Sequence, residues 1–401
     1  MNNEVEIRHL LLIAALDSVS YGLIYGFIST YVLQLGGSHI TVGILAVGNL
    51  IGELLSPDVM SLLTHLHGKR FTLFFILNIA FVTNLMIVST ESFWFTILVR
   101  ILFSMTNRSE SLCLDLLLNK VENDDSRQVL HNYHSFLSSS GYIIGPIISG
   151  YLFDSGFLYI GILAALCDFV NIRLLMSVKR NENDKNNDHV DQSVIQNAIN
   201  IVTDSLQNLK TCTLSKNWDL LLLKYLFASS IITFLSKFTQ ILKHNFNSSN
   251  VTIGYTLAYI NIMVFSATYL VPVAIKNINK FSLVSINELS FISIGFLIVA
   301  ACYAPYYKLF MFLLIPIIIL RTLLLNIFKE LFSQRKNQSL AKLNNAASGL
   351  AGLTAPLFFG IICNHAEHNT VILFSCIPMF MCFAILRYYT RFITTTEVNS
   401  N

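Results

Sequence analysis

The chain has 401 residues, of which 54% are hydrophobic and only 12% are charged. Soluble domains carry about 25% charged residues, so this composition excludes an ordinary soluble enzyme, a disordered chain and a collagen-like chain. The formal net charge of +3 is too small to indicate a nucleic-acid partner. An integral membrane protein is the class that remains.

Long apolar runs follow one another along nearly the whole sequence. A membrane-spanning helix needs about 20 mostly apolar residues, and about twelve runs reach that length. The runs are continuous rather than alternating, which excludes an outer-membrane barrel. The first run contains Asp17 and lacks a basic start, so it is interpreted as a span and not as a cleaved signal peptide. The predicted spans are 9–33, 40–62, 70–89, 92–115, 131–153, 156–177, 218–242, 251–274, 283–303, 306–328, 342–364 and 370–391.

Basic residues gather in the loops on one side of these predicted spans. Such a bias places the basic side in the cytoplasm, so both termini are predicted to be cytoplasmic, in either the plasma membrane or an endomembrane. Asn247 begins an Asn-Ser-Ser sequon in a loop on the opposite side and is a candidate for glycosylation. The basic positions include Lys69, Arg70, Lys120, Arg127, Lys276, Lys280, Lys329 and Arg335.

The only long polar stretch separates two sets of six predicted spans. Residues 179–217 combine a polar linker with apolar positions at helical spacing, which predicts an amphipathic helix on the inner membrane surface. The predicted organisation is a six-helix bundle at 1–178, this linker at 179–217, a second six-helix bundle at 218–392 and a cytoplasmic tail at 393–401.

The two halves repeat short motifs in the same order. The repeated motifs are Ser38-x-x-Thr41-x-Gly43 with Ser249-x-x-Thr252-x-Gly254, and Pro146-x-x-x-Gly150 with Pro356-x-x-x-Gly360. Arg100 and Arg321 each lie in the fourth predicted span of their half. A six-helix unit present twice is typical of secondary transporters, whose bundles rock around a site at the bilayer midplane. The predicted fold is therefore all-α, with two pseudo-symmetric bundles in the membrane.

Asp17 lies near the middle of the first predicted span. A charge at the bilayer centre costs about 2.5–3.5 kcal/mol on insertion scales, so such a residue usually faces a polar interior. Asp17 is either a proton or cation site in a cavity, or a structural hydrogen-bonding group with a partner such as Ser18 or Ser20.

Further charged residues also lie inside predicted spans. Arg100 and Arg321 either hold an anion, pair with Asp17 or Glu53, or brace the ends of their helices. Glu53 either contributes to packing between helices or lines the cavity, and the sequence favours neither. Asp115, near the inner end of the fourth span, is interpreted as a gate or loop contact.

The fifth predicted span contains a row of small residues at four-residue spacing, namely Gly141, Gly145 and, after Pro146, Gly150. Small residues let another helix approach closely, and proline permits a bend. No nucleotide-binding, hydrolase or metalloprotease motif occurs in a usable context. We therefore expect no enzymatic activity, no cofactor and no metal site.

These segments resemble the major facilitator superfamily. Residues Leu16 to Ile24 are similar to the L-D-x-x-G-x-G-L-I pattern of its drug/proton antiporter, tetracycline-efflux-like branch, which includes animal major facilitator superfamily domain-containing proteins. Gly141 to Gly150 is similar to the antiporter motif, and Arg100 matches the arginine of the fourth-helix motif. The signature loop G-x-L-A-D-R-x-G-R-R is matched at Leu63, Gly68, Lys69 and Arg70, with His65 and Leu66 in place of the aspartate and the first arginine.

The resemblance implies a proton-coupled exporter of a small organic solute that works by alternating access, as a monomer in the lipid bilayer. It also implies an inner charge network in which Lys69 or Arg70 pairs with Asp115. Two alternatives stay open. One is a uniporter or organic-anion carrier. The other, motivated by His65 and Leu66, is a scaffold or sensor that kept the fold and lost transport.

Overall fold

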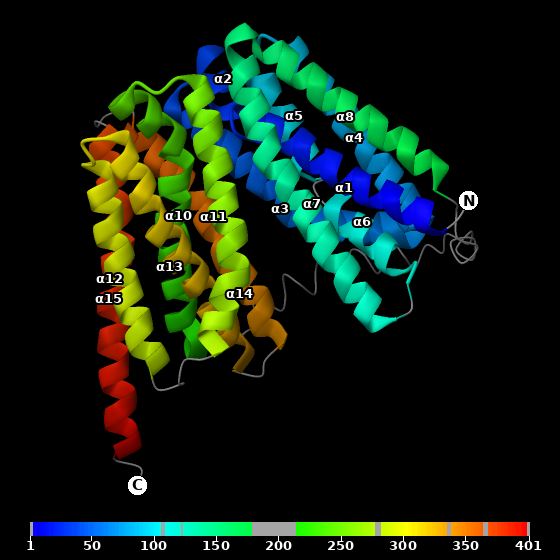
Figure 1. Ribbon diagram of the computed structural model, residues 1–401. Coiled ribbons are helices and arrows are strands. Elements are labelled where there is room, and N and C mark those ends of the chain that lie inside the picture. Colours follow the sequence, from blue (N-terminus) through cyan, green and yellow to red (C-terminus); the bar gives the residue numbers. More distant parts are fainter. Residues whose placement is uncertain are drawn as a thin grey trace. The chain divides into compact units, whose positions relative to one another are not determined.

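The computed structural model describes residues 3–105, 109–121, 123–178, 214–276, 282–334, 338–363 and 368–398. Every regular element within these ranges is a helix, which confirms the predicted all-α class. The helices form two compact units (Figure 1). Unit 1 comprises Met1–Leu206 and Ser249–Asn261, and unit 2 comprises Gln207–Ser248 and Ile262–Asn401. Most of the predicted linker, with its amphipathic helix, and the end of the predicted tail lie outside the described residues.

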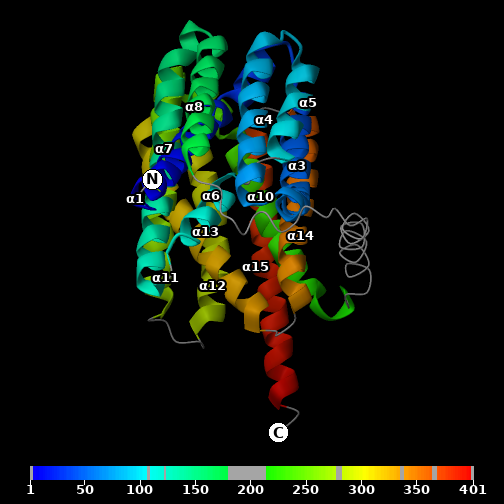
Figure 2. The same cartoon turned by 90° about the vertical axis from the view of Figure 1, so that its right-hand side faces the viewer.

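Unit 1 is organised around its first helix. This helix, α1 (Asn3–Tyr25), packs against α7, α8 and α6, while α4 packs on α8 and α3 packs on α5. Figure 2 shows α7 beside α8, and α3 beside α5. The remaining elements are α2 (Ile28–Gln34), α3 (His39–His67), α4 (Lys69–Ser89), α5 (Phe93–Met105), α6 (Ser109–Leu118), α7 (Asp124–Leu152), a 3-10 turn at Phe153–Ser155 and α8 (Phe157–Ser177).

Unit 2 is built from the later helices. Within it α10 packs against α14 and α15, and α12 packs against α13 and α15. Helix α11 divides at Asn261, so its first half belongs to unit 1 and its second half to unit 2. The bounds are α10 (Leu214–Phe246), α11 (Asn250–Lys276), α12 (Ser282–Cys302), α13 (Tyr307–Gln334), α14 (Gln338–Cys363) and α15 (His368–Val398).

The repeated Ser-x-x-Thr motif starts a helix in both places. The Ser38 hydroxyl accepts a hydrogen bond from the Thr41 backbone N–H at 3.3 Å, before α3. The Ser249 hydroxyl accepts the same bond from Thr252 at 3.2 Å, before α11. A serine at this position satisfies one of the N–H groups that the first turn of a helix leaves without a partner. The sequence repeat is therefore a repeated helix cap.

Gly68 forms the sharp connection between α3 and α4. It is the last residue before α4 and has a φ of 83°, in the left-handed region that a side chain disfavours. The connection has no other residue, so Lys69 and Arg70 lie in the first turn of α4.

Seven helical segments in the described ranges are long and apolar enough to cross a membrane, and eight if the bent pair in α10 is one span. The predicted count of twelve is thus not reached by length and hydropathy alone. Three shorter apolar helices, Glu288–Cys302, Ala347–Cys363 and Leu373–Tyr388, fall within predicted spans. Within the fourth predicted span, 92–115, the described residues form α5, of 13 residues, and the first part of α6, of 10 residues, on either side of residues 106–108.

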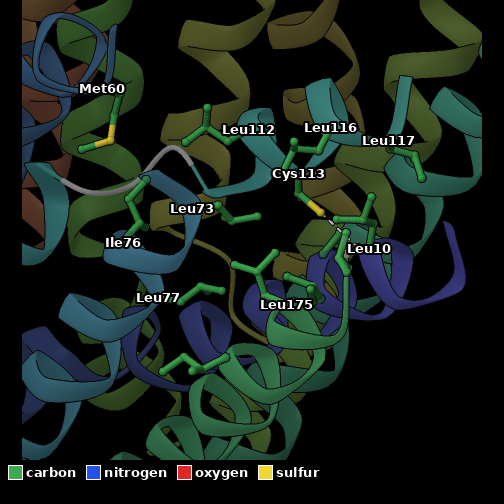
Figure 3. Close-up of a cluster of buried hydrophobic side chains, with 14 residues drawn as sticks. Leu10, Met60, Leu73, Ile76, Leu77, Leu112, Cys113, Leu116, Leu117 and Leu175 are labelled. Carbon is green, nitrogen blue, oxygen red and sulfur yellow. Dashed lines mark hydrogen bonds between the residues drawn. The ribbon is translucent and has the colours of Figure 1, made fainter. Parts of the chain in front are cut away.

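A cluster of buried apolar side chains joins the helices of unit 1 (Figure 3). Each fully buried leucine or isoleucine contributes about 1.5–3 kcal/mol relative to its exposed state in water, although part of this gain is replaced by lipid contact in a bilayer. The Cys113 thiol donates to the Leu10 carbonyl at 3.0 Å and ties α6 to α1. The cluster includes Leu10, Ile13, Met60, Leu73, Ile76, Leu77, Leu112, Cys113, Leu116, Leu117, Ile172 and Leu175.

Candidate functional site

Helix α1 presents polar side chains to two different sets of neighbours. Asp17 and Tyr21 are four residues apart and lie on one face, which meets side chains of α5, α6 and α7. Ser20 meets α4 and α8. Helix α1 therefore contributes residues to two polar clusters. The residues that it contributes lie within the candidate span Glu4–Gln34.

Asp17 is held by a residue that the sequence did not single out. The Ser109 hydroxyl, on α6, donates to the Asp17 carboxylate at 2.5 Å. The serines suggested from the sequence make other bonds, because Ser18 donates to the Ala14 carbonyl at 2.9 Å and Ser20 to the Ala164 carbonyl at 3.3 Å. Glu110 also lies close enough to Asp17 for their charges to interact. The described charged residue next to Ser109 in this contact is thus acidic.

Arg100 is buried on α5, with 1% of its surface exposed. Its guanidinium carbon lies 4.7 Å from the Phe103 ring centre, 5.2 Å from that of Tyr21 and 6.0 Å from that of Tyr25. A cation over an aromatic face gains about 0.5–2 kcal/mol. Neither terminal nitrogen, Nη1 or Nη2, has a hydrogen-bond partner among the described residues.

The two acidic candidates do not pair with Arg100. Within the described chain, no ion pair of 4.0 Å or less joins Arg100 to Asp17 or Glu53. Glu53 accepts instead from the Asn49 side chain at 2.8 Å, one turn earlier on α3. The Arg100 pairing considered from the sequence is therefore absent among the described residues.

Aromatic rings connect these groups. The Tyr21 ring packs edge-on against Tyr142 of α7 with centres 5.7 Å apart, and stacks on Tyr25 at 5.2 Å. Tyr142 in turn interacts with Glu110. We call this set the α1 polar cluster; its members are Asp17, Tyr21, Glu53, Arg100, Ser109, Glu110 and Tyr142.

A second cluster, which the sequence reasoning missed, surrounds Asp168 of α8. The Asn84 amide, on α4, donates to the Asp168 carboxylate at 2.7 Å and to the Ser20 hydroxyl at 3.2 Å. Asn171 lies one turn further along α8. Asp168, Asn84 and Asn171 are each 0% exposed. An acidic residue inside the predicted span 156–177 was the signal that could have revealed this cluster.

Two basic residues in the apolar helices of unit 2, Lys224 and Arg321, interact with each other. Lys224 of α10 is 5% exposed, and its ammonium lies 5.2 Å from the Phe328 ring centre and 5.8 Å from that of Phe227. Arg321 of α13 is close enough to interact with it electrostatically. The sequence identified Arg321 and missed Lys224, although a lysine inside the predicted span 218–242 was visible.

The charged residues after α3 form contacts within unit 1. Lys69 pairs with Asp115 at 3.1 Å, as one of the two suggested pairings. Arg70 donates to the carbonyls of Leu175 and Met176 at 3.4 and 3.3 Å. A cation at this position complements the negative end of α8, so Arg70 holds a helix end and Lys69 provides the ion pair.

The small residues of α7 lie against the backbone of α1. A Cβ on Gly145 would approach Gly22 to 2.7 Å, and one on Gly141 would approach the Ala15 carbonyl oxygen to 2.7 Å. Only glycine permits such close helices, and Pro146 lies beside Gly22 at the same contact. Gly141 and Gly145 therefore flank the part of α1 that carries Asp17.

The remaining candidates lie further along the chain. Gly150 contacts the start of α11 within unit 1, where an added Cβ would lie 2.8 Å from the Asn250 carbonyl oxygen. Pro356 and Gly360 are buried in α14. Asn247 is exposed between α10 and α11, with a φ of 46°. Its exposure suits a modification site, and its glycosylation stays a prediction.

The α1 polar cluster combines properties that suit ion or solute handling. It holds half-buried carboxyl groups that form no ion pair with a basic side chain among the described residues, a buried guanidinium with unused donors, and aromatic rings. Intramembrane ionisable groups are expensive to insert and usually mark a pathway for an ion or a substrate. No His, Cys or carboxylate cluster that could hold a metal was found in the described ranges.

Comparisons with known proteins agree with this architecture. The sequence pattern of the Major Facilitator Superfamily matches residues 10–321. No curated protein sequence matches the chain significantly. Among solved structures, that of the nucleoside transporter NupG has a TM-score of 0.75 at 12% identity, and the match covers 97% of this chain and 100% of that of NupG.

Two other solved transporters share the fold. A bacterial homologue of the human lysosomal transporter Spinster has a TM-score of 0.72 at 12% identity, covering 97% of both chains. The human organic anion transporter MFSD10 (TETRAN) has a TM-score of 0.63 at 11% identity, covering 96% of this chain and 100% of its own. At these identities the likeness concerns the fold. With the family pattern spanning most of its length, the chain is a multi-pass membrane protein, not an enzyme, and belongs to the major facilitator superfamily of transporters.

Proposed function

We propose that the chain exchanges a small organic solute for protons by alternating access, and that the Asp17 carboxyl carries the proton. The observation that carries the proposal is the setting of Asp17, inside a span, held by the neutral Ser109 hydroxyl and near the acidic Glu110. Without a fixed basic partner, the carboxyl can change its charge by taking up or releasing a proton. A change of charge at such a position biases a two-state equilibrium between conformations.

The packing of α1 supports a link between this charge and helix movement. Gly141 of α7 contacts Ala15, Ser18 and Val19, which surround Asp17 on α1. A change in how Asp17 is solvated therefore acts at a close helix contact in unit 1. In a rocking transporter, such contacts must be kept or remade as the bundles move.

The remaining parts of the proposal rest on the sequence. Both termini are cytoplasmic, the protein works as a monomer in the plasma membrane or an endomembrane, and the solute leaves the cytoplasm as protons enter. The basic loops support the orientation, and the resemblance to the antiporter branch supports the direction.

A second candidate function is transport of an organic anion without proton coupling. Arg100 supports it, because a buried guanidinium with two unpartnered terminal nitrogens is suited to a carboxylate or phosphate. Lys224, near Arg321, would be a second basic position. The solved human relative named above is described as an organic anion transporter, which agrees with this candidate.

The experiment is a transport assay with purified protein in liposomes. A pH gradient is imposed, internal pH is followed, and small cations, anions and neutral compounds are added in turn. We expect one class of solute to cause proton movement, and Asp17→Asn to reduce that movement by at least about 10-fold, since a neutral side chain cannot cycle a proton. The matched control Asp125→Asn removes an exposed carboxyl at the start of α7 and should leave transport unchanged.

The outcomes separate the candidates. Solute flux that ignores the pH gradient, in the unaltered protein and in Asp17→Asn alike, would exclude proton coupling. Flux of anions alone that is lost in Arg100→Gln would favour the anion carrier. Absence of any flux from folded protein, across the whole panel, would favour a scaffold that kept the fold.

A further inference from the structure

The Asp168 cluster contains buried polar atoms that the protein itself does not satisfy. These atoms are Asp168 Oδ1, Asn84 Oδ1, and both Oδ1 and Nδ2 of Asn171. All three side chains are completely buried. Buried polar atoms nearly always have a partner, and each exception calls for an explanation such as a bound water or ion.

The cluster lies inside the membrane-spanning part of unit 1. Asp168 is about 16 Å from the start of α8 at 1.5 Å per residue, and α8 and α4 both qualify as spans. Three helices contribute to the cluster, because Ser20 comes from α1, Asn84 from α4 and Asp168 with Asn171 from α8. The Asn84 amide bonds to both Ser20 and Asp168 and so fixes their relative position.

No basic side chain compensates the Asp168 carboxylate. The described residues include no Lys, Arg or His within 4.0 Å of it. The only basic residue on α8 is Arg173, whose guanidinium stacks on Phe169 at 5.1 Å. The charged group that does interact with Asp168 is Asp17, another carboxyl. A buried carboxylate without a counter-charge is strongly unfavourable, so the group is neutralised either by a proton or by a cation from outside the chain.

The unpartnered atoms define the chemistry of that partner. Three are oxygens that accept hydrogen bonds or bind cations, and the Ser20 hydroxyl oxygen accepts from the Asn84 amide at 3.2 Å. Hard cations bind carboxylate, amide and hydroxyl oxygens. The cluster carries one formal negative charge, which a single monovalent cation balances, whereas a divalent ion would leave an excess positive charge among apolar helices.

We propose that Asp168, Asn84, Asn171 and Ser20 form a binding site for one monovalent alkali cation between α1, α4 and α8. The residues of the site differ from those of the α1 polar cluster, although Asp168 interacts electrostatically with Asp17. The site itself does not depend on the proposed exchange of solute and protons. A bound cation would neutralise Asp168 and join three helices of unit 1, so its primary effect is on the stability of that unit.

The experiment measures thermal unfolding of the purified full chain in detergent, with Na⁺ as the probe. Ionic strength is held constant while choline is replaced by Na⁺ at fixed pH. A ligand that binds only the folded state raises the unfolding midpoint with the logarithm of its concentration. We expect a rise of about 2 °C for each tenfold increase in Na⁺ above its dissociation constant, and binding of about one radioactive ²²Na⁺ per chain.

Two variants and one control test the assignment. Asp168→Asn removes the charge and the need for a counter-ion, so it should fold and lose the Na⁺-dependent rise and the ²²Na⁺ binding. Asn171→Ala keeps the charge and removes one oxygen, and should weaken Na⁺ binding by at least about tenfold. Asp125→Asn, which removes an exposed carboxyl, should behave like the unaltered protein.

Three results would overturn the proposal. The first is an equal midpoint in choline and Na⁺ for the unaltered protein, which would mean that water or a proton satisfies the cluster. The second is a Na⁺-dependent rise that persists in Asp168→Asn. The third is normal Na⁺ affinity in Asn171→Ala. Because these are equilibrium binding measurements, they are independent of the transport assay, and failure of one proposal does not imply failure of the other.

Discussion

Two ion pairs in unit 1 show how burial determines the contribution of an ion pair to the free energy of unfolding. Lys120 and Glu6 lie 2.7 Å apart with 10% and 3% of their side chains exposed, whereas Lys69 and Asp115 lie 3.1 Å apart with 36% and 53% exposed. Exposed pairs contribute about 0–1 kcal/mol. Removing one partner of a buried pair costs about 3–5 kcal/mol, because it leaves an uncompensated charge.

We therefore predict that Lys120→Met lowers the free energy of unfolding by about 3–5 kcal/mol, and Lys69→Met by less than about 1 kcal/mol. The measurement is unfolding in detergent micelles, with Lys69→Met as the matched control. Adding Glu6→Gln to Lys120→Met should recover most of the loss. Equal effects of the two lysine variants would contradict this account.

The sequence predicted which residues are candidates better than it predicted their partners. Asp17 and Arg100 were recognisable as charges inside apolar runs. The Ser109 hydroxyl that holds Asp17 is 92 residues away in the chain, and the rings around Arg100 come from α1 as well as α5. These contacts depend on how helices pack, which the pattern of a single helix does not specify. Asp168 was equally recognisable by the same criterion.

Among the elements, the contact between α1 and α7 leaves little room for a larger side chain. At Gly145 an added Cβ would lie 2.7–2.8 Å from the backbone of Gly22 and Leu23. Backbone atoms cannot change rotamer, so they move only if the whole helix moves. We predict that Gly145→Ala destabilises the protein by about 1–3 kcal/mol, because the helices must separate. The measurement is the unfolding midpoint in detergent.

Gly295 of α12 provides the control for this prediction. A Cβ there would meet only the Phe380 ring, at 3.0–3.4 Å, and a side chain can adjust. Alanine also favours a helix over glycine by about 1 kcal/mol, so Gly295→Ala should be neutral within about 1 kcal/mol. A Gly145→Ala variant as stable as Gly295→Ala would show that the α1–α7 contact is looser than the structure indicates.

The elements also show where sequence patterns are reliable. The Ser-x-x-Thr repeat marked two helix starts because a cap depends only on neighbouring residues. The small-residue row on α7 correctly indicated a close helix contact, although the sequence did not identify α1 as the partner.

For the molecule as a whole, composition alone indicated the membrane and the all-helical class, since a chain with 12% charged residues cannot cover a soluble surface. The motif repeat indicated two halves. The division of α11 at Asn261 between the two compact units was not predictable, because it depends on tertiary contacts with α7 rather than on the polar linker that marks the boundary in the sequence.

The basic loops predict the orientation of the whole chain in the membrane, with both termini in the cytoplasm. We expect Asn247→Cys to react with a bulky membrane-impermeant maleimide in intact cells, and Ser126→Cys to react only after permeabilisation, because the first lies in a predicted outer loop and the second follows a basic inner loop. Both positions are exposed. The described native cysteines are buried or half-buried, so a Cys212→Ser background limits unwanted labelling. Labelling of Ser126→Cys in intact cells, with Asn247→Cys protected, would mean that the chain is inserted the opposite way and that the positive-inside argument fails for it.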